Sequence, residues 1–100
     1  MQPESSPDEP VVGQITLRYW AAARSAAGVA AEQVAVTGPV SLASLIEASV
    51  ARHDPSGPLT GVLARCSVLL GDVPVATADP ATLMVAPGDS VEFLPPFAGG

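Results

Sequence analysis

Apolar and polar residues alternate along three stretches of the sequence, with the period of two that is typical of half-buried β-strands. These stretches are Gln14–Trp20, Glu32–Thr37 and Ser90–Leu94. In the first, Tyr19 and Trp20 point to opposite faces, as Phe93 and Leu94 do in the last. Gly38-Pro39 ends the second stretch, so we expect the first two strands to form a wide hairpin.

A spacing of three and four residues replaces this alternation after Ser41, and it predicts the main helix over Leu42–Arg52. Ser41 is a suitable N-cap, and His53-Asp54-Pro55 stops the helix. One helix face is mainly apolar and should pack across a sheet; it carries Leu42, Leu45, Ile46, Ser49 and Val50.

Shorter elements are predicted on both sides of this helix. Ala21–Ala27 is alanine-rich and ends at Gly28, which can adopt the left-handed conformation of a helix terminus. Leu59–Ala64 is expected to form a further helical turn. Cys66–Leu70 is a continuous run that suits a buried strand, and Val73–Ala76 suits a short strand after the Gly71-Asp72 turn. Asp79-Pro80 and Pro87-Gly88-Asp89 predict two more turns.

The order of these elements predicts a single domain with an α+β fold, a roll in which one main helix packs on a mixed sheet of about five short strands. At 100 residues the chain has room for only one core. We expect a flexible, acidic and proline-rich leader at 1–13, the folded domain at 14–94 and an extended tail at 95–100.

Composition and charge exclude several classes of protein. The hydrophobic fraction of 48% supplies a core, and the charged fraction is only 14%, which argues against wholesale disorder. Four arginines against ten carboxylates give a formal net charge of −6, which disfavours nucleic acid and anionic lipid as partners. The same imbalance favours, weakly, a protein partner with a basic patch.

The single cysteine, Cys66, cannot form an internal disulfide or a multi-cysteine metal site. The N-terminal residues lack the basic start and apolar run of a signal peptide, and no stretch reaches the length that spans a membrane. We therefore expect a cytoplasmic protein with no metal site of its own.

The C-terminal segment is the most informative part of the sequence. The last strand is followed at once by Pro95-Pro96-Phe97-Ala98-Gly99-Gly100. Two prolines disfavour helix and ladder pairing, so the segment should project in an extended form. Gly99 and Gly100 have no side chains, so a terminal carboxylate could enter a cleft in which any Cβ would clash. A frayed terminus that merely ends in glycine would explain the diglycine alone equally well.

Joined to the first strand, this ending resembles a known family. ITLRYWAAARSAAG near the start and PGDSVEFLPPFAGG at the end resemble the molybdopterin synthase small subunit, a ubiquitin-like (β-grasp) sulfur carrier of the MoaD/ThiS type. The resemblance covers roughly residues 15–100, and its middle part is matched mainly in pattern. With the diglycine as the last two residues, no processing would be needed to expose the carboxylate.

The resemblance implies a relay centred on Gly100. An E1-like adenylyltransferase with ATP and Mg²⁺ would convert the Gly100 carboxylate to an acyl-adenylate, because a free carboxylate is a poor electrophile. A sulfur donor, such as a cysteine desulfurase or rhodanese-like protein, would then yield the thiocarboxylate. The tail would insert into the large subunit of molybdopterin synthase and give its sulfur to cyclic pyranopterin monophosphate, forming the molybdopterin dithiolene.

The resemblance also assigns roles to residues. Gly100 carries the adenylate and thiocarboxylate, and Gly99 gives it access. Pro95, Pro96, Phe97 and Ala98 would line the partner's channel. Trp20 and Leu94 fall at positions by which family members bind the large subunit, although Trp20 could instead cover a second small core. The implied assembly is a heterotetramer of two carriers on a large-subunit dimer, and the chain itself binds no cofactor.

Two other residues invite a catalytic interpretation that the sequence does not favour. Cys66 lies in an apolar run, where a lone cysteine is usually a buried and inert core residue. His53 stands beside Asp54, but a helix C-terminus stabilises a partly charged histidine without any catalysis. No catalytic triad, phosphate-binding loop or metal-ligand spacing is visible, so an independent active site is not expected.

Three alternative functions stay open. The thiocarboxylate could serve thiamine thiazole or cysteine synthesis, although Pro-Pro-Phe-Ala before the diglycine favours the molybdopterin type. The chain could be a β-grasp interaction module whose tail is never activated. It could also be conjugated to lysines of other proteins in the manner of ubiquitin; its own lack of lysine excludes only chains built on itself.

Overall fold

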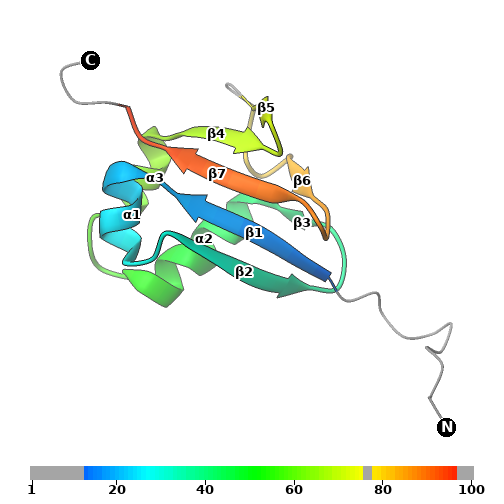
Figure 1. Ribbon diagram of the computed structural model, residues 1–100, viewed down its shortest axis with the longest axis horizontal. Helices are drawn as coiled ribbons and strands as arrows, with labels where there is room; N and C mark the ends of the chain where they lie inside the picture. The colour runs from blue at the N-terminus through cyan, green and yellow to red at the C-terminus, as the bar shows by residue number, and fades with distance from the viewer. Residues whose placement is uncertain (1–12, 76–77, 97–100) are drawn as a thin grey trace, which may run out of the picture.

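The computed structural model describes residues 13–75 and 78–96, and its centre is a five-stranded mixed sheet (Figure 1). The strands are β1 (Gly13–Tyr19), β2 (Ala31–Val36), β4 (Ser67–Leu70), β5 (Val73–Pro74) and β7 (Ser90–Leu94), in the spatial order β2-β1-β7-β4-β5. β1 and β7 pair in parallel, and all other pairs in this sheet are antiparallel. The predicted α+β roll of β-grasp type is confirmed.

The alternation in the sequence corresponds to the two faces of this sheet. Ile15, Leu17 and Tyr19 of β1 are buried, as are Val91 and Phe93 of β7. Their neighbours Arg18 and Leu94 are respectively exposed and half-buried on the other face. Because the two strands pair in register from Thr16↔Ser90 to Tyr19↔Phe93, their apolar side chains form one continuous layer.

Three helices cover the apolar face of the sheet, and none of the described helices lies on the opposite face (Figure 1). They are α1 (Ala21–Ala27), α2 (Leu42–His53) and α3 (Leu59–Arg65). The Ser41 side chain accepts a hydrogen bond from Ser44 N at 3.1 Å, which confirms it as the N-cap of α2. Gly28 ends α1 with a φ of 82°, the left-handed conformation expected there.

The structure corrects the sequence-based interpretation around Cys66. This residue is not part of a strand: it follows α3 as its C-cap, and β4 begins at Ser67. β4 is not a buried strand either, because Ser67 is exposed and the following three residues are only half-buried. The reason is that the helices do not cover the side of the sheet where β4 pairs with the two-residue strand β5.

A second small sheet had no counterpart in the sequence analysis. It pairs β3 (Val40–Ser41) with β6 (Met84–Val85), so the segment before α2 is held against the segment before β7. Val85 is fully buried and joins the core, and Leu42 N donates a hydrogen bond to Leu83 O at 2.8 Å. None of the described helices has the length and apolar character required to cross a bilayer.

Candidate functional site

The parallel pairing of β1 and β7 places the ends of both strands at one edge of the sheet (Figure 1). Trp20 follows β1 directly and Pro95 follows β7 directly. The backbone links them, since Trp20 N donates a hydrogen bond to Phe93 O at 3.2 Å. We call this place the tail exit and define it by Trp20, Leu94 and Pro95.

Trp20 is the largest exposed apolar side chain among the described residues, with 47% of its surface accessible. It is not the last residue of β1, as the alternation predicted, but the N-cap of α1. Its indole Nε1 donates to Glu92 Oε1 of β7 at 3.0 Å, which holds the ring beside the end of the sheet. The predicted separation of Trp20 from the buried Tyr19 is confirmed.

The chain turns sharply between β1 and α1. Ala21 has a φ of 48°, the only positive φ at a non-glycine residue among those described. This conformation brings Cβ close to the backbone and typically costs about 1 kcal/mol. The turn allows Ala23 N to donate a hydrogen bond to Trp20 O at 2.9 Å, and this bond fixes Trp20 at the start of the helix.

The other residues predicted for the site are only partly visible. Leu94 and Pro95 are half-buried and Pro96 is exposed. Leu94 pairs with Ser67 of β4, so the exit is flanked by β1 on one side and β4 on the other. Phe97, Ala98, Gly99 and Gly100, which include the predicted thiocarboxylate site, lie outside the described residues.

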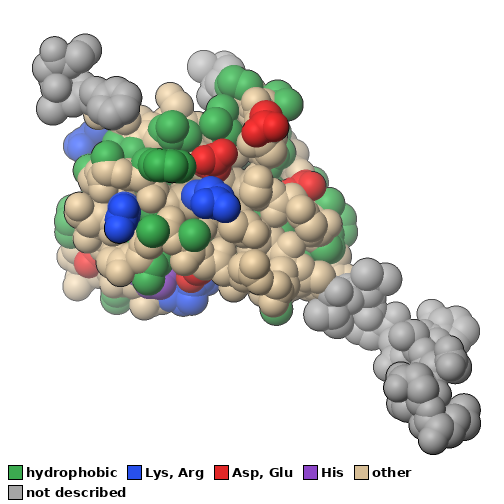
Figure 2. Space-filling view, viewed as in Figure 1, with side chains coloured by type: hydrophobic (Ala, Val, Ile, Leu, Met, Phe, Trp, Pro, Cys, Tyr) green, Lys and Arg blue, Asp and Glu red, His purple; other side chains and the backbone are tan. Residues whose placement is uncertain are grey.

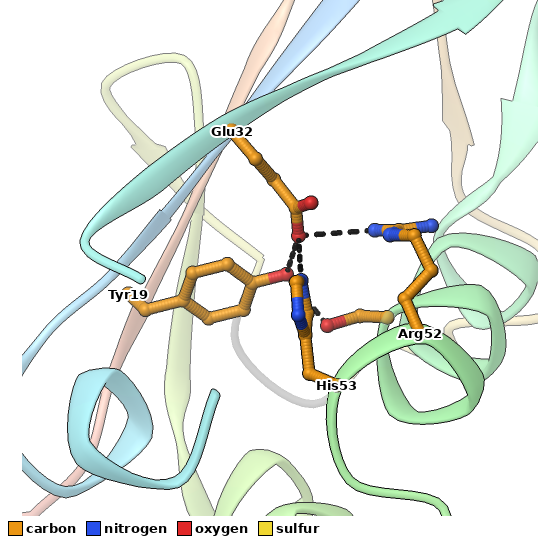
Figure 3. Close-up of polar contacts among 5 residues, drawn as sticks. Tyr19, Glu32, Arg52 and His53 are labelled. Carbon is orange, nitrogen blue, oxygen red and sulfur yellow. Dashed lines mark hydrogen bonds and ion pairs between the residues drawn. The ribbon is translucent and has the colours of Figure 1, made fainter. Parts of the chain in front are cut away.

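A polar cluster lies under the sheet and anchors the end of β1 (Figure 3). The Tyr19 hydroxyl donates to Glu32 Oε2 at 2.6 Å and lies 2.6 Å from Ser49 Oγ, which is itself fully buried. Arg52 Nη2 and His53 Nε2 approach the same oxygen of Glu32 at 3.0 and 2.8 Å. The Tyr19 ring also stacks on Phe93 at 5.5 Å, so the cluster ties both strand ends to α2.

The cluster fixes the charge state of Glu32. Burial opposes ionisation, but hydrogen bonds from Arg52, Tyr19 and His53 outweigh it and lower the pKa of Glu32 to about 2. Burial, followed by the hydrogen bond to Glu32, raises the pKa of Tyr19 well above its ordinary value. Glu32 is therefore a carboxylate at any physiological pH and is held by the donors around it. This suits a structural role at the end of β1 rather than a role as a catalytic acid or base.

The sequence analysis missed this cluster because its members come from β1, β2 and α2. The sequence places His53 beside Asp54, but the hydrogen-bond partner of His53 in the fold is Glu32. Asp54 instead accepts a hydrogen bond from Leu59 N at 2.9 Å and so caps the start of α3. The one available signal was Glu32 itself, the only charged residue of β2.

Cys66 is separate from both the tail exit and the cluster. It is half-buried, its Sγ donates to Val62 O at 3.2 Å, and burial raises the pKa of its thiol to about 11. An inert thiol agrees with the sequence-based interpretation, although the residue is less buried than expected. In residues 13–75 and 78–96, no three histidine, cysteine or acidic side chains gather closely enough to hold a metal ion.

A family model decides the relationship of this chain to known proteins. The model of the ThiS family matches residues 17–100, which includes the end of β1, all of β7 and the segment after it. The chain belongs to the ThiS family. It is thus a ubiquitin-like protein of the ThiS/MoaD sulfur-carrier type. A comparison with curated protein sequences finds no match.

Solved structures support the fold. SAMP1 from Haloferax volcanii is 23% identical, with a TM-score of 0.69 over 88% of this chain and 100% of that one. Urm1 from Trypanosoma brucei is 18% identical, with a TM-score of 0.69 over 89% and 97%. A putative molybdopterin converting factor, subunit 1, from Pyrococcus furiosus is 22% identical, with a TM-score of 0.64 over 85% and 99%. At these identities the likeness establishes the β-grasp fold.

Proposed function

We propose that this chain is the sulfur-carrier small subunit of molybdopterin synthase. The observation that carries the proposal is the match to the ThiS family over residues 17–100, which includes the diglycine. The segment Leu94-Pro95-Pro96-Phe97-Ala98 before it favours the molybdopterin type over the thiazole type. The end of β7 supports the proposal, because it places Pro95, the start of the C-terminal segment, beside an exposed tryptophan.

In this proposal Gly100 is the only residue of the chain that reacts. Its carboxylate attacks the α-phosphate of MgATP on an E1-like adenylyltransferase and releases pyrophosphate. The sulfur of a donor persulfide then displaces AMP, and reductive cleavage of the sulfur–sulfur bond by a thiol leaves the thiocarboxylate. Gly99 allows close approach, and the large subunit supplies the substrate pocket in which sulfur passes to cyclic pyranopterin monophosphate.

The rest of the chain positions this tail. Pro95, Pro96, Phe97 and Ala98 extend into the partner's channel, and Trp20 and Leu94 form the apolar contact around its entrance. A tryptophan that is 47% exposed yet held by a hydrogen bond loses little conformational freedom on binding, which favours its use as an anchor. The proposed assembly is two carriers on a large-subunit dimer.

Mass spectrometry of the chain after incubation with the activating enzyme, MgATP and a sulfur donor tests the proposal. Fragmentation must place the change on Gly100, because exchange of oxygen for sulfur adds nearly the same mass as oxidation of Met1, Met84 or Cys66. The chain lacking Gly99 and Gly100 is the control and should remain unmodified. An unmodified Gly100, beside a competent carrier that is modified in parallel, would refute the carrier role.

A second step assigns the pathway. The modified chain is mixed with the large subunit and cyclic pyranopterin monophosphate, and molybdopterin is measured as its fluorescent oxidation product. Formation of molybdopterin supports the proposed pathway. Transfer only to a thiazole-forming system, or only to lysines of other proteins, would leave the carrier role intact and refute the molybdopterin assignment.

The contact surface can be tested separately with Trp20→Ala. Val73→Ala is a matched control, because Val73 is also an exposed apolar residue but lies at the opposite end of the sheet, where β4 turns into β5 (Figure 1). The first variant should bind the large subunit at least about tenfold more weakly, as is usual for an aromatic anchor, and the second should bind normally. Equal binding by both variants would exclude Trp20 from the interface.

A further inference from the structure

Two of the four arginines in this acidic chain lie at one pocket beside the tail exit. The pocket has a volume of about 200 Å³ and is lined by Arg18, Tyr19, Trp20, Arg24, Ala30 and Ala31. We call it the arginine pocket. Arg18 comes from β1 and Arg24 from α1, so the sharp turn at Ala21 is what brings them to the same place. Figure 2 shows basic and apolar side chains next to one another on this face.

Neither arginine forms an ion pair in the part of the chain that the structure describes. The ion pairs found there both involve Glu32, whose partners are Arg52 and His53. Arg18 lies opposite Glu92 in the parallel register of β1 and β7, yet these two side chains form no ion pair. The Glu92 carboxylate accepts a hydrogen bond from the Trp20 indole instead. This hydrogen bond holds the Glu92 carboxylate at Trp20 with its charge intact, and neither pocket arginine has an ion-pair partner among the described residues.

The chemistry of the pocket favours a carboxylate as its ligand. A guanidinium group binds a carboxylate through two parallel hydrogen bonds. Two such groups in a pocket that an indole also lines offer both charge and an apolar surface. The net charge of −6 makes a polyanion such as nucleic acid an unsuitable ligand, because the rest of the surface would repel it. An acidic side chain on a protein surface brings one charge to one place and avoids this repulsion.

We propose that the arginine pocket receives an aspartate or glutamate side chain of the protein that accepts the C-terminal tail. This inference rests on the proposed function and adds to it a charged contact beside the Trp20 anchor. The pocket adjoins the tail exit, since Trp20 lines the one and defines the other. A carboxylate seated there fixes how the carrier is rotated about its tail, which an extended diglycine segment cannot do by itself.

Charge reversal at each pocket arginine tests the proposal. Arg18→Glu and Arg24→Glu are compared with Arg65→Glu, an exposed arginine on α3 that does not line the pocket. All three variants have the same net charge of −8, because each replaces one positive by one negative charge in a chain of −6. Circular dichroism verifies that each variant is folded, and titration calorimetry measures its affinity for the activating enzyme and for the large subunit.

The pocket variants should bind at least one of these two partners about tenfold more weakly than Arg65→Glu does. Raising the salt concentration from about 0.05 to about 0.5 M should reduce this difference in affinity, because salt screens the charges. Equal affinities for all three variants would overturn the proposal of the arginine pocket. If the wild-type chain still bound its partners in that case, the proposed carrier role would be unaffected. Wild-type chain that bound neither partner would overturn both. Tight binding of inorganic phosphate at the pocket, with partner affinities unchanged in the variants, would assign the pocket to a free anion instead.

Discussion

Glu32→Gln should destabilise the fold at neutral pH and flatten the pH dependence of its stability. The substitution keeps the length of the side chain and one acceptor oxygen for the Tyr19 hydroxyl, so it removes mainly the negative charge that faces Arg52 and His53. Glutamine at this position leaves the Arg52 guanidinium without its counter-charge beneath the sheet.

The magnitude follows from the pKa of Glu32. Its fall from 4.5 to about 2 corresponds to about 3 kcal/mol of folding free energy, at about 1.4 kcal/mol for each pKa unit. The Glu32 side chain is 18% accessible and that of Arg52 is 36% accessible, so solvent screening reduces this upper limit. We expect a loss of about 1–2 kcal/mol in the free energy of unfolding at pH 7.

The sign of the pH dependence also follows. The folded state has the lower pKa, so between pH 4.5 and about 2 the unfolded chain binds more protons at Glu32. The stabilisation is fully present above pH 4.5 and is lost as the pH falls through about 2. The wild-type chain should therefore approach the stability of the Glu32→Gln variant as the solution is acidified.

Urea unfolding followed by circular dichroism at several pH values between about 2.5 and 7 measures both effects. Glu47→Gln is the matched control, because Glu47 is an exposed residue of α2 and takes part in neither of the ion pairs described. The reasoning is refuted if Glu32→Gln is as stable as Glu47→Gln at pH 7. It is equally refuted if the gap between wild type and Glu32→Gln is as large at pH 2.5 as at pH 7.

Three further predictions concern the backbone and the thiol. Ala21→Gly should leave the melting temperature unchanged or raise it, because glycine tolerates the φ of 48°. Ala22→Gly within the same helix should lower the free energy of unfolding by about 1 kcal/mol. Calorimetry compares the two variants. Gly88→Ala should lower stability by about 1 kcal/mol in urea unfolding, since Gly88 has a φ of 95°, and an unchanged midpoint would contradict this. Cys66 should react with iodoacetamide at pH 8 about 100-fold more slowly in the folded than in the urea-unfolded chain. The reason is that a thiol pKa of about 11 instead of 9.0 leaves far less thiolate. Folded and unfolded rates within a factor of ten of each other would contradict this prediction.

The sequence predicted those parts of the fold that depend on local patterns. The strand Ser90–Leu94 was placed with its observed bounds because apolar and polar residues alternate along it without interruption. The start of α2 was placed correctly because Ser41 is a capping residue directly before a helical repeat. The end of α1 was placed by Gly28, whose conformation few other residues adopt.

The features that were missed depend on contacts between distant residues. β3 and β6 contain two residues each, too few to show any period, and their pairing accompanies the burial of Val85 in the core. The run Cys66–Leu70 carries no signal that separates a helix end from a strand start. Glu32 could not be linked to Ser49 or Arg52 before the packing of β2 against α2 was known. At the tail exit, the sequence placed Trp20 and Leu94 at the ends of two strands, but it did not bring Arg18 and Arg24 together.

The parallel pairing of β1 with β7 also constrains how the molecule can fold. The two strands at the centre of the sheet are the first and the last in the sequence, so roughly seventy residues separate the partners of the innermost ladder. Until Ser90–Leu94 is available, β1 and β4 each have an unpaired edge, which is a known starting point for aggregation. A nascent chain can thus form the β1–β2 hairpin and its helices early, but it completes its sheet only when its final strand arrives. Premature termination before Ser90 should therefore yield an aggregation-prone fragment rather than a shorter folded domain.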